Sequence, residues 1–267
     1  MTDFETISLK REDRVAFLTL NRPDSLNAFD TVMRREFVTA ARILNQDDEI
    51  RVVVLTGSGR AFCAGADLAE KKNDPAIAAA GGQLTEDLLN YEYKPGVMSI
   101  YRAPKPWIAA VNGAAAGIGS AYALACDLVV MAENAYLYQA FQAIGLIPDG
   151  GATWHLLRTL GQKRAYEFII SGEKVNAQKC HSLGLCNRVV EADSLLKVVK
   201  DWALEISEKA PLALRYSKES LIFAADHNLS DVIANEASLQ HLCIDSNDAK
   251  EGVTAFMEKR KAVFSGD

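Results

Sequence analysis

Short apolar runs alternate with amphipathic stretches through the first half of the chain. The apolar runs fall at residues 15–20, 52–55, 107–111 and 127–131. Runs of this length and composition are typical of strands buried on both faces of a parallel sheet. Residues 31–44 instead carry apolar side chains at helical spacing, with Val32 and Phe37 expected on one face. Asp30 is placed to cap this helix. Strands interleaved with helices predict right-handed crossovers and a helix-covered sheet, which is an α/β fold class.

A weaker pattern follows between residues 68 and 103. The breaks in it are Gly81, Gly82, Pro75 and Pro95. We expect a mobile helix-loop segment there, of the kind that often lines a pocket. The second half is mainly helical, with helices predicted at about residues 151–160, 163–170, 177–183 and 193–209, and later ones beginning at Pro211, Ser230 and residue 247 or 248. We therefore predict a core over residues 1–209 and a C-terminal helical subdomain over residues 210–267.

Composition narrows the class of protein. With 49% hydrophobic residues, the chain has enough apolar surface for a packed core and is not of the disordered type. The formal net charge is -6 and no basic patch stands out, so neither nucleic acid nor an anionic membrane surface is an expected partner. The five cysteines show no CxxC spacing, and the first residues lack the apolar core of a signal peptide. We expect a cytoplasmic protein without a disulfide framework or a metal site.

Two glycine-rich turns each follow a predicted strand. They span residues 59–68 (GRAFCAGADL) and 111–121 (VNGAAAGIGSA). Such a turn exposes backbone N–H groups, and a helix that starts in it adds the positive end of its dipole. Two turns that face each other would hold one oxyanion without a side-chain acid. Either turn alone is explained equally well by close packing of a helix on a strand. The glycines of the second turn do not form the GxGxxG of a dinucleotide site.

The two turns belong to a longer series of motifs that runs in order along nearly the whole chain. The motifs are residues 60–68 (RAFCAGADL), 106–113 (PWIAAVNG), 126–128 (CDL), 144–149 (IGLIPD) and 250–260 (KEGVTAFMEKR). Together they resemble the crotonase (enoyl-CoA hydratase/isomerase) superfamily. The resemblance implies a spiral core of repeated ββα turns and C-terminal helices that join subunits into a homotrimer or a hexamer (a dimer of trimers).

The resemblance also implies an acyl-CoA thioester as the ligand, with CoA as part of the substrate and no separate cofactor. The family's two oxyanion donors are backbone N–H groups at positions that match Ala66 and Ile118. The residues expected to contact CoA or the acyl group are Ala64, Ala66, Asp67, Leu68, Ile118, Phe141 and Lys259. Lys259, together with Arg260, would meet CoA phosphates across a subunit boundary. A solvated, charged helix end explains these two residues equally well.

Two departures from the family pattern bear on the reaction. Family hydratases use two glutamates to position and deprotonate water, and the matching positions here are Ala121 and Phe141. Neither side chain takes a proton, so water addition by that route is disfavoured. The remaining candidate is Asp149, in a segment that resembles the isomerase branch of phenylacetate breakdown, where an aspartate at this position is the proposed base. The alternative for Asp149 is a Pro-Asp-Gly turn and a helix cap.

These observations leave three functions open. The leading one is an enoyl-CoA isomerase, with Asp149 as the proton shuttle and the amides of Ala66 and Ile118 holding the enolate oxygen. The others are an enoyl-CoA hydratase with a non-standard base and a non-catalytic acyl-CoA-binding protein. Aromatic residues of the weakly patterned segment, including Tyr93, line an acyl pocket or pack a helix face. For Ser120, helix packing is favoured over a nucleophilic role, because no GxSxG elbow surrounds it.

Overall fold

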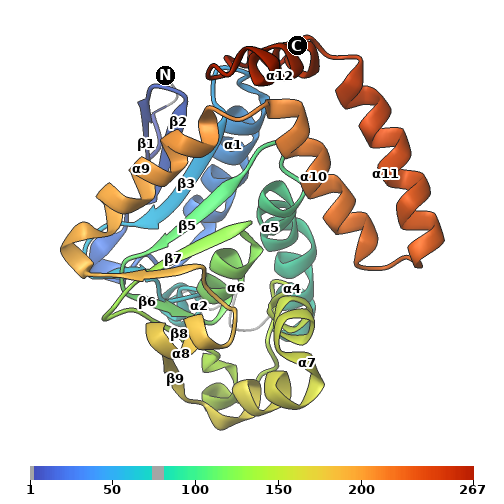
Figure 1. The fold of residues 1–267 in the computed structure, drawn as a ribbon. Helices are drawn as coiled ribbons and strands as arrows, with labels where there is room; N and C mark the ends of the chain where they lie inside the picture. Colours follow the sequence, from blue (N-terminus) through green and yellow to red (C-terminus); the bar gives the residue numbers. More distant parts are fainter. Residues whose placement is uncertain (1–2, 74–80) are drawn as a thin grey trace.

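The computed structural model describes residues 3–73 and 81–267, and its strands form two sheets (Figure 1). The larger sheet has six strands in the order β1-β2-β3-β5-β7-β10, parallel except for the β1–β2 pair. Their bounds are Ile7–Glu12, Val15–Leu20, Val52–Gly57, Trp107–Val111, Leu128–Ala132 and Arg188–Val190. The smaller sheet has four strands in the order β4-β6-β8-β9, with bounds Ala61–Cys63, Ala114–Ala116, Tyr136–Tyr138 and Lys174–Asn176.

The chain alternates between the two sheets. β3 enters the larger sheet and β4 the smaller one, and the pairs β5–β6 and β7–β8 repeat this step. Each pair is followed by a helical segment before the next strand of the larger sheet. This repeated strand–strand–helix path is the ββα spiral that the resemblance implies, so the predicted α/β fold class is confirmed.

Helices cover the sheets and make up the end of the chain. Those before residue 140 are α1 (Thr31–Gln46), α2 (Leu68–Asn73), α4 (Gly81–Leu88), the π-helix Leu89–Tyr93, α5 (Lys94–Tyr101) and α6 (Ile118–Ala125). Those after it are α7 (Ala152–Ser171), α8 (Ala177–Ser182), α9 (Leu195–Ser207), α10 (Pro211–Ala224), α11 (Leu229–Ile244) and α12 (Asn247–Glu258). Among the described helices, none has both the length and the apolarity that a membrane crossing requires.

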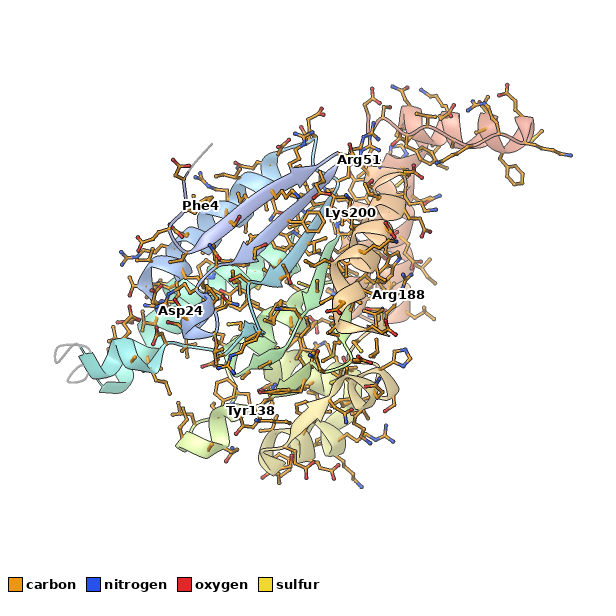
Figure 2. The ribbon with its side chains drawn as sticks, turned by 90° about the vertical axis from the view of Figure 1, so that its left-hand side faces the viewer. Phe4, Asp24, Arg51, Tyr138, Arg188 and Lys200 are labelled. Atoms are coloured by element: carbon orange, nitrogen blue, oxygen red, sulfur yellow. The ribbon has the colours of Figure 1, made fainter. Side chains whose placement is uncertain are left out.

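The C-terminal region is helical, as predicted. Figure 1 shows α10, α11 and α12 at one end of the molecule, with α11 lying apart from the sheets. Arg51, labelled in Figure 2, sits where the larger sheet meets this region, and its guanidinium donates to the carbonyl oxygens of Phe264 and Ser265 at 2.9 Å each. These bonds tie the tail that follows α12 to the core. The division between residues 209 and 210 stays a prediction.

The helix α1 forms where the spacing predicts it. The carboxylate of Asp30 accepts from the backbone N–H of Met33 at 2.8 Å, so the predicted N-cap is confirmed. Phe37 is buried, but Val32 is 38% exposed and Met33 takes the inward position. The prediction that Val32 lies on the buried face was therefore wrong, because the next residue, Met33, occupies that face. A charged residue within this helix, Arg34, is buried and lines the site described below.

Residues 68–73 and 81–101 of this segment are helical, so the break predicted at Pro95 was wrong. Pro95 is the second residue of α5, which continues from the π-helix without an intervening loop. Gly81 and Gly82 are the first two residues of α4. Pro75 lies outside the described residues. The π-helix between α4 and α5 is a form often found at functional sites.

Candidate functional site

A cavity of about 310 Å³ lies where the two glycine-rich turns meet. Its wall contains nearly all the residues that the sequence singled out. They are Ala64, Gly65, Ala66, Asp67, Leu68, Tyr93, Gly117, Ile118, Phe141 and Asp149. Segments separated by more than 80 residues in the chain thus contribute to one site. Leu84, Leu88 and Leu89, which no sequence argument singled out, add an apolar wall from α4 and the π-helix.

The first turn is held by Phe29, which lies beside it as a short parallel bridge. The Phe29 N–H donates to the Gly65 carbonyl at 2.8 Å, and the Asp67 N–H donates to the Phe29 carbonyl at 2.9 Å. In a parallel pair, the residue between these two bonding groups directs its own N–H and C=O to the other side. The Ala66 N–H therefore points away from Phe29, and Ala66 itself lines the cavity.

The second turn ends in a helix N-terminus. Gly117 takes the N-cap position of α6 with φ of 52°, a left-handed value that favours glycine. Ile118 is the first residue of the helix, so its N–H is one of the donors that have no acceptor within the helix. The N–H of Gly117 is bound elsewhere, at 2.9 Å from the carbonyl of Tyr138 at the end of β8.

The two turns are in direct contact through their glycines. A Cβ built on Gly65 would lie 3.1 Å from the carbonyl oxygen of Ala116 and 3.8 Å from the Cα of Gly117. On the neighbouring helix, a Cβ at Gly119 would lie 2.5 Å from the carbonyl oxygen of Cys63. Larger residues at these positions would separate the turns. The glycines therefore allow the turns to pack closely, and this packing brings the two amide-bearing loops together.

Cys63 lies buried between the turns. Its Sγ accepts from the N–H of Gly65 at 3.4 Å, and burial raises the pKa of the thiol to about 12. The thiol therefore stays protonated at neutral pH, and its contact with Gly65 is structural.

Asp149 reaches the cavity from the loop before α7. The next residue, Gly150, packs against α6: a Cβ built on it would lie 2.9 Å from Cγ1 of Ile118 and 3.0 Å from Cβ of Ala121. Asp149 is partly exposed, but its Oδ1 atom is buried. The N-cap of α7 is Gly151, and the backbone carbonyl of Asp149 accepts from Ala152 N at 3.0 Å. A carboxylate is thus carried into the cavity on the loop that covers Ile118.

The other carboxylates of the cavity wall are bound to arginines. Asp67 pairs with Arg22 at 3.0 Å, while Glu70 and Glu92 both pair with the buried Arg34. Burial opposes the charged form of Glu70, but hydrogen bonds from Thr31 and the charge of Arg34 outweigh it and lower its pKa. Through Arg34, the carboxylates of Glu70 and Glu92 fix α1, α2 and the π-helix to one another.

Tyr93 is the aromatic residue of the weakly patterned segment that reaches the cavity. It is buried, and burial raises the pKa of its phenol, with a further contribution from the negative charge of Asp149. Its neighbour Tyr91 is 76% exposed, and Tyr101 instead packs edge-on against Trp154. A neutral phenol and the Asp149 carboxylate therefore face the same small space.

The two positions that the resemblance matches to the hydratase glutamates, Ala121 and Phe141, carry apolar side chains close to this space. Ala121 is fully buried in α6, and Phe141 is buried and lines the cavity. Lys259 does not line it: it is the C-cap of α12, which Figure 1 shows at the far end of the molecule from α2 and α6. Its contact with the CoA of a neighbouring subunit stays a prediction. Within the described part of the chain, no group of His, Cys, Asp or Glu is placed to hold a metal ion.

Comparisons with known proteins agree over nearly the whole chain. A model of the enoyl-CoA hydratase/isomerase family matches residues 10–267. The chain is 36% identical to the 1,2-epoxyphenylacetyl-CoA isomerase of Escherichia coli, over 96% of each protein, and 38% identical to a probable enoyl-CoA hydratase of Rhodobacter capsulatus, over 98% of this chain and 99% of that protein. A crystal structure of an enoyl-CoA hydratase from Polaromonas sp. JS666 superposes with a TM-score of 0.92 at 35% identity, covering 97% and 99% of the two chains.

Proposed function

The chain belongs to the enoyl-CoA hydratase/isomerase family, and from this premise we propose that it isomerises an enoyl-CoA, moving a double bond near the thioester. The observation that carries the proposal is the pairing of one carboxylate, Asp149, with two converging amide-bearing turns in one cavity. The names of similar proteins include both isomerases and hydratases, so the chemistry of the site has to separate the two.

In the proposed reaction, the N–H groups of Ala66 and Ile118 donate to the thioester oxygen. The Asp149 carboxylate removes a proton from the α carbon of a 3-enoyl-CoA, and the electrons move through the carbonyl onto that oxygen to give a dienolate. The same carboxyl group then returns the proton at the γ carbon, which leaves the conjugated 2-enoyl product. Charge develops on the oxygen only during the reaction, so donors fixed beforehand stabilise the transition state more than the substrate.

The surroundings suit proton transfer better than water addition. Phe141 and Ile118 put apolar groups beside Asp149, and Ala121 lies buried under the loop that carries it. None of these three side chains orients a water molecule by hydrogen bonding. The net change in the substrate is a proton shift, so the proposed chemistry requires no metal or nicotinamide. CoA would be held as part of the substrate along the stretch that includes Ala64, Asp67 and Leu68.

The direct test is the conversion of 3-enoyl-CoA to 2-enoyl-CoA, seen as a rise in conjugated-enoyl absorbance. Replacing Asp149 by Asn keeps the size of the side chain and removes the base, so we expect a loss of at least about 100-fold in kcat. Binding of a saturated acyl-CoA should remain within about twofold of wild type. Full activity in the Asn variant would exclude Asp149 as the base.

The second candidate, a hydratase with a non-standard base, is favoured by the hydratase names among the relatives. It predicts loss of enoyl absorbance from crotonyl-CoA and no product from 3-enoyl-CoA. A non-catalytic acyl-CoA-binding protein would bind both esters and convert neither.

A further inference from the structure

Behind the second turn, a chain of buried polar groups leads away from the cavity. The Ser120 hydroxyl donates to the Gly117 carbonyl at 2.7 Å, and the Gln139 side-chain amide donates to the Ser120 hydroxyl at 2.9 Å. Ser120 and Gln139 are both fully buried. From this geometry we propose that Ser120 and Gln139 are positioning residues that aim the Ile118 N–H at the substrate oxygen. The inference rests on the proposed function, because it assigns a task to these residues in the same oxyanion site.

The argument begins with the peptide group between Gly117 and Ile118. The Gly117 carbonyl and the Ile118 N–H belong to the same planar unit, and the described peptide bonds are trans. In a trans peptide the C=O and N–H point in opposite directions, so fixing the carbonyl fixes the direction of the N–H. The carbonyl is held twice, by the Ser120 hydroxyl and by the Ser120 N–H at 3.0 Å.

The orientation of the Gln139 amide follows from the same contacts. The single hydroxyl proton of Ser120 is used on the Gly117 carbonyl, so its oxygen needs a donor from Gln139. Turning the amide over would place two acceptors against each other. The amide nitrogen must therefore face Ser120, which leaves Gln139 Oε1 buried without a donor among the described residues.

That buried acceptor argues against a packing role. A buried carbonyl oxygen without a donor destabilises the fold, and an apolar side chain of similar volume would fill the space without that penalty. The neighbouring residue supports a link to the turn, because the Tyr138 carbonyl accepts the Gly117 N–H at 2.9 Å. The end of β8 thus holds the turn from two sides, through the Tyr138 backbone and the Gln139 side chain.

The experiment compares Ser120→Ala and Gln139→Met with a matched control, Ser207→Ala. Ser207 is also a buried serine whose hydroxyl donates to the carbonyl three residues earlier, Leu204, at 2.7 Å, and it lies in α9 outside the cavity wall. We expect kcat with 3-enoyl-CoA to fall about 10-fold in both test variants. Removing an oxyanion donor altogether costs about 100-fold or more, and a donor that is only tilted should cost less. The KM and the pH profile should not move, and the control should match wild type.

A second readout separates positioning from folding. The vibrational frequency of an isotopically labelled thioester carbonyl, in an acyl-CoA that does not react, reports how strongly the bound oxygen is polarised. Wild type and Ser207→Ala should lower this frequency on binding, and the two test variants should lower it less. If both test variants show the wild-type shift, the inference is refuted even where their melting temperatures fall.

The same measurement distinguishes the two proposals. If wild-type protein binds the ester and does not shift its carbonyl frequency, the oxyanion site itself is wrong and the proposed function fails. Should Ser120→Ala not fold, Gln139→Met decides alone. It removes the donor that holds the Ser120 oxygen, so the hydroxyl is free to turn away from the Gly117 carbonyl.

Discussion

Substitution of Gly119 by alanine tests whether the spacing of the two turns sets the rate. Gly119 lies in α6, one residue after Ile118, and a Cβ there would lie 2.5 Å from the Cys63 carbonyl oxygen, 2.7 Å from its Cβ and 2.8 Å from its Sγ. Real Cβ atoms do not approach closer than about 3.0 Å, so α6 and β4 must separate by at least about 0.5 Å. This moves the Ile118 amide away from the turn that carries Ala66.

The magnitude follows from that displacement. A misplacement of about 1 Å costs about 100-fold in rate, so about 0.5 Å should lower kcat by about 10-fold. The contacts are with the backbone and the Cβ of a buried residue, which cannot rotate aside. Overpacking of this kind destabilises a protein by about 1–3 kcal/mol, or roughly 2–10 °C in Tm for a domain of this size.

The assay is steady-state conversion of 3-enoyl-CoA, together with thermal unfolding. Gly252→Ala is the matched control, because Gly252 is also helical but its new Cβ would meet only Phe264, at an ordinary 3.5 Å. That control should keep wild-type kcat and gain up to about 1 kcal/mol of stability. A folded Gly119→Ala protein with wild-type kcat would refute the idea that the two turns must meet at this distance.

Three further predictions concern other parts of the molecule. Asp149→Glu keeps the carboxylate but moves it by about one methylene, so it should retain more activity than Asp149→Asn, by at least about 10-fold in kcat with 3-enoyl-CoA. Burial, with a contribution from the charge of Arg158, lowers the pKa of His155 to about 4. The unfolded chain protonates this histidine at about pH 6.5, so its contribution to stability is complete above that pH and is lost as the pH falls toward 4. Stability should therefore fall by up to about 3 kcal/mol between pH 6.5 and 4, and His155→Phe should remove that part of the slope in denaturant unfolding curves. Arg51→Met removes the bonds to the tail carbonyls, so unfolding free energy should drop by about 1–3 kcal/mol and limited proteolysis should cut the tail faster.

The sequence predicted those elements in which the hydrophobic pattern extends over several helical turns or strand positions. β3 and β5 are continuous apolar runs, and the spacing in α1 exceeds three helical turns. The strands of the smaller sheet were missed because each has only three residues, too few to show a period. β1 was missed because it lies at the edge of its sheet and only Ile7 of its six residues is buried, so it shows no apolar run.

The site shows the same division. The two glycine-rich turns and Asp149 could be found from short sequence motifs. Close approach of two backbone segments requires glycine, and Asp149 lies in a Pro-Asp-Gly motif. Ser120 gave no such signal, because its partner Gln139 follows β8, 19 residues further along the chain, and is brought close only by the fold. Arg34 was missed for a similar reason: its two glutamate partners come from segments 36 and 58 residues away.

A crystal structure with a bound, non-isomerisable acyl-CoA tests the central claim most directly. We predict that the thioester oxygen lies about 2.7–3.1 Å from the backbone nitrogens of both Ala66 and Ile118, with a carboxylate oxygen of Asp149 facing the α and γ carbons. A thioester oxygen bound elsewhere, or only one of the two amides within that distance, would contradict the account.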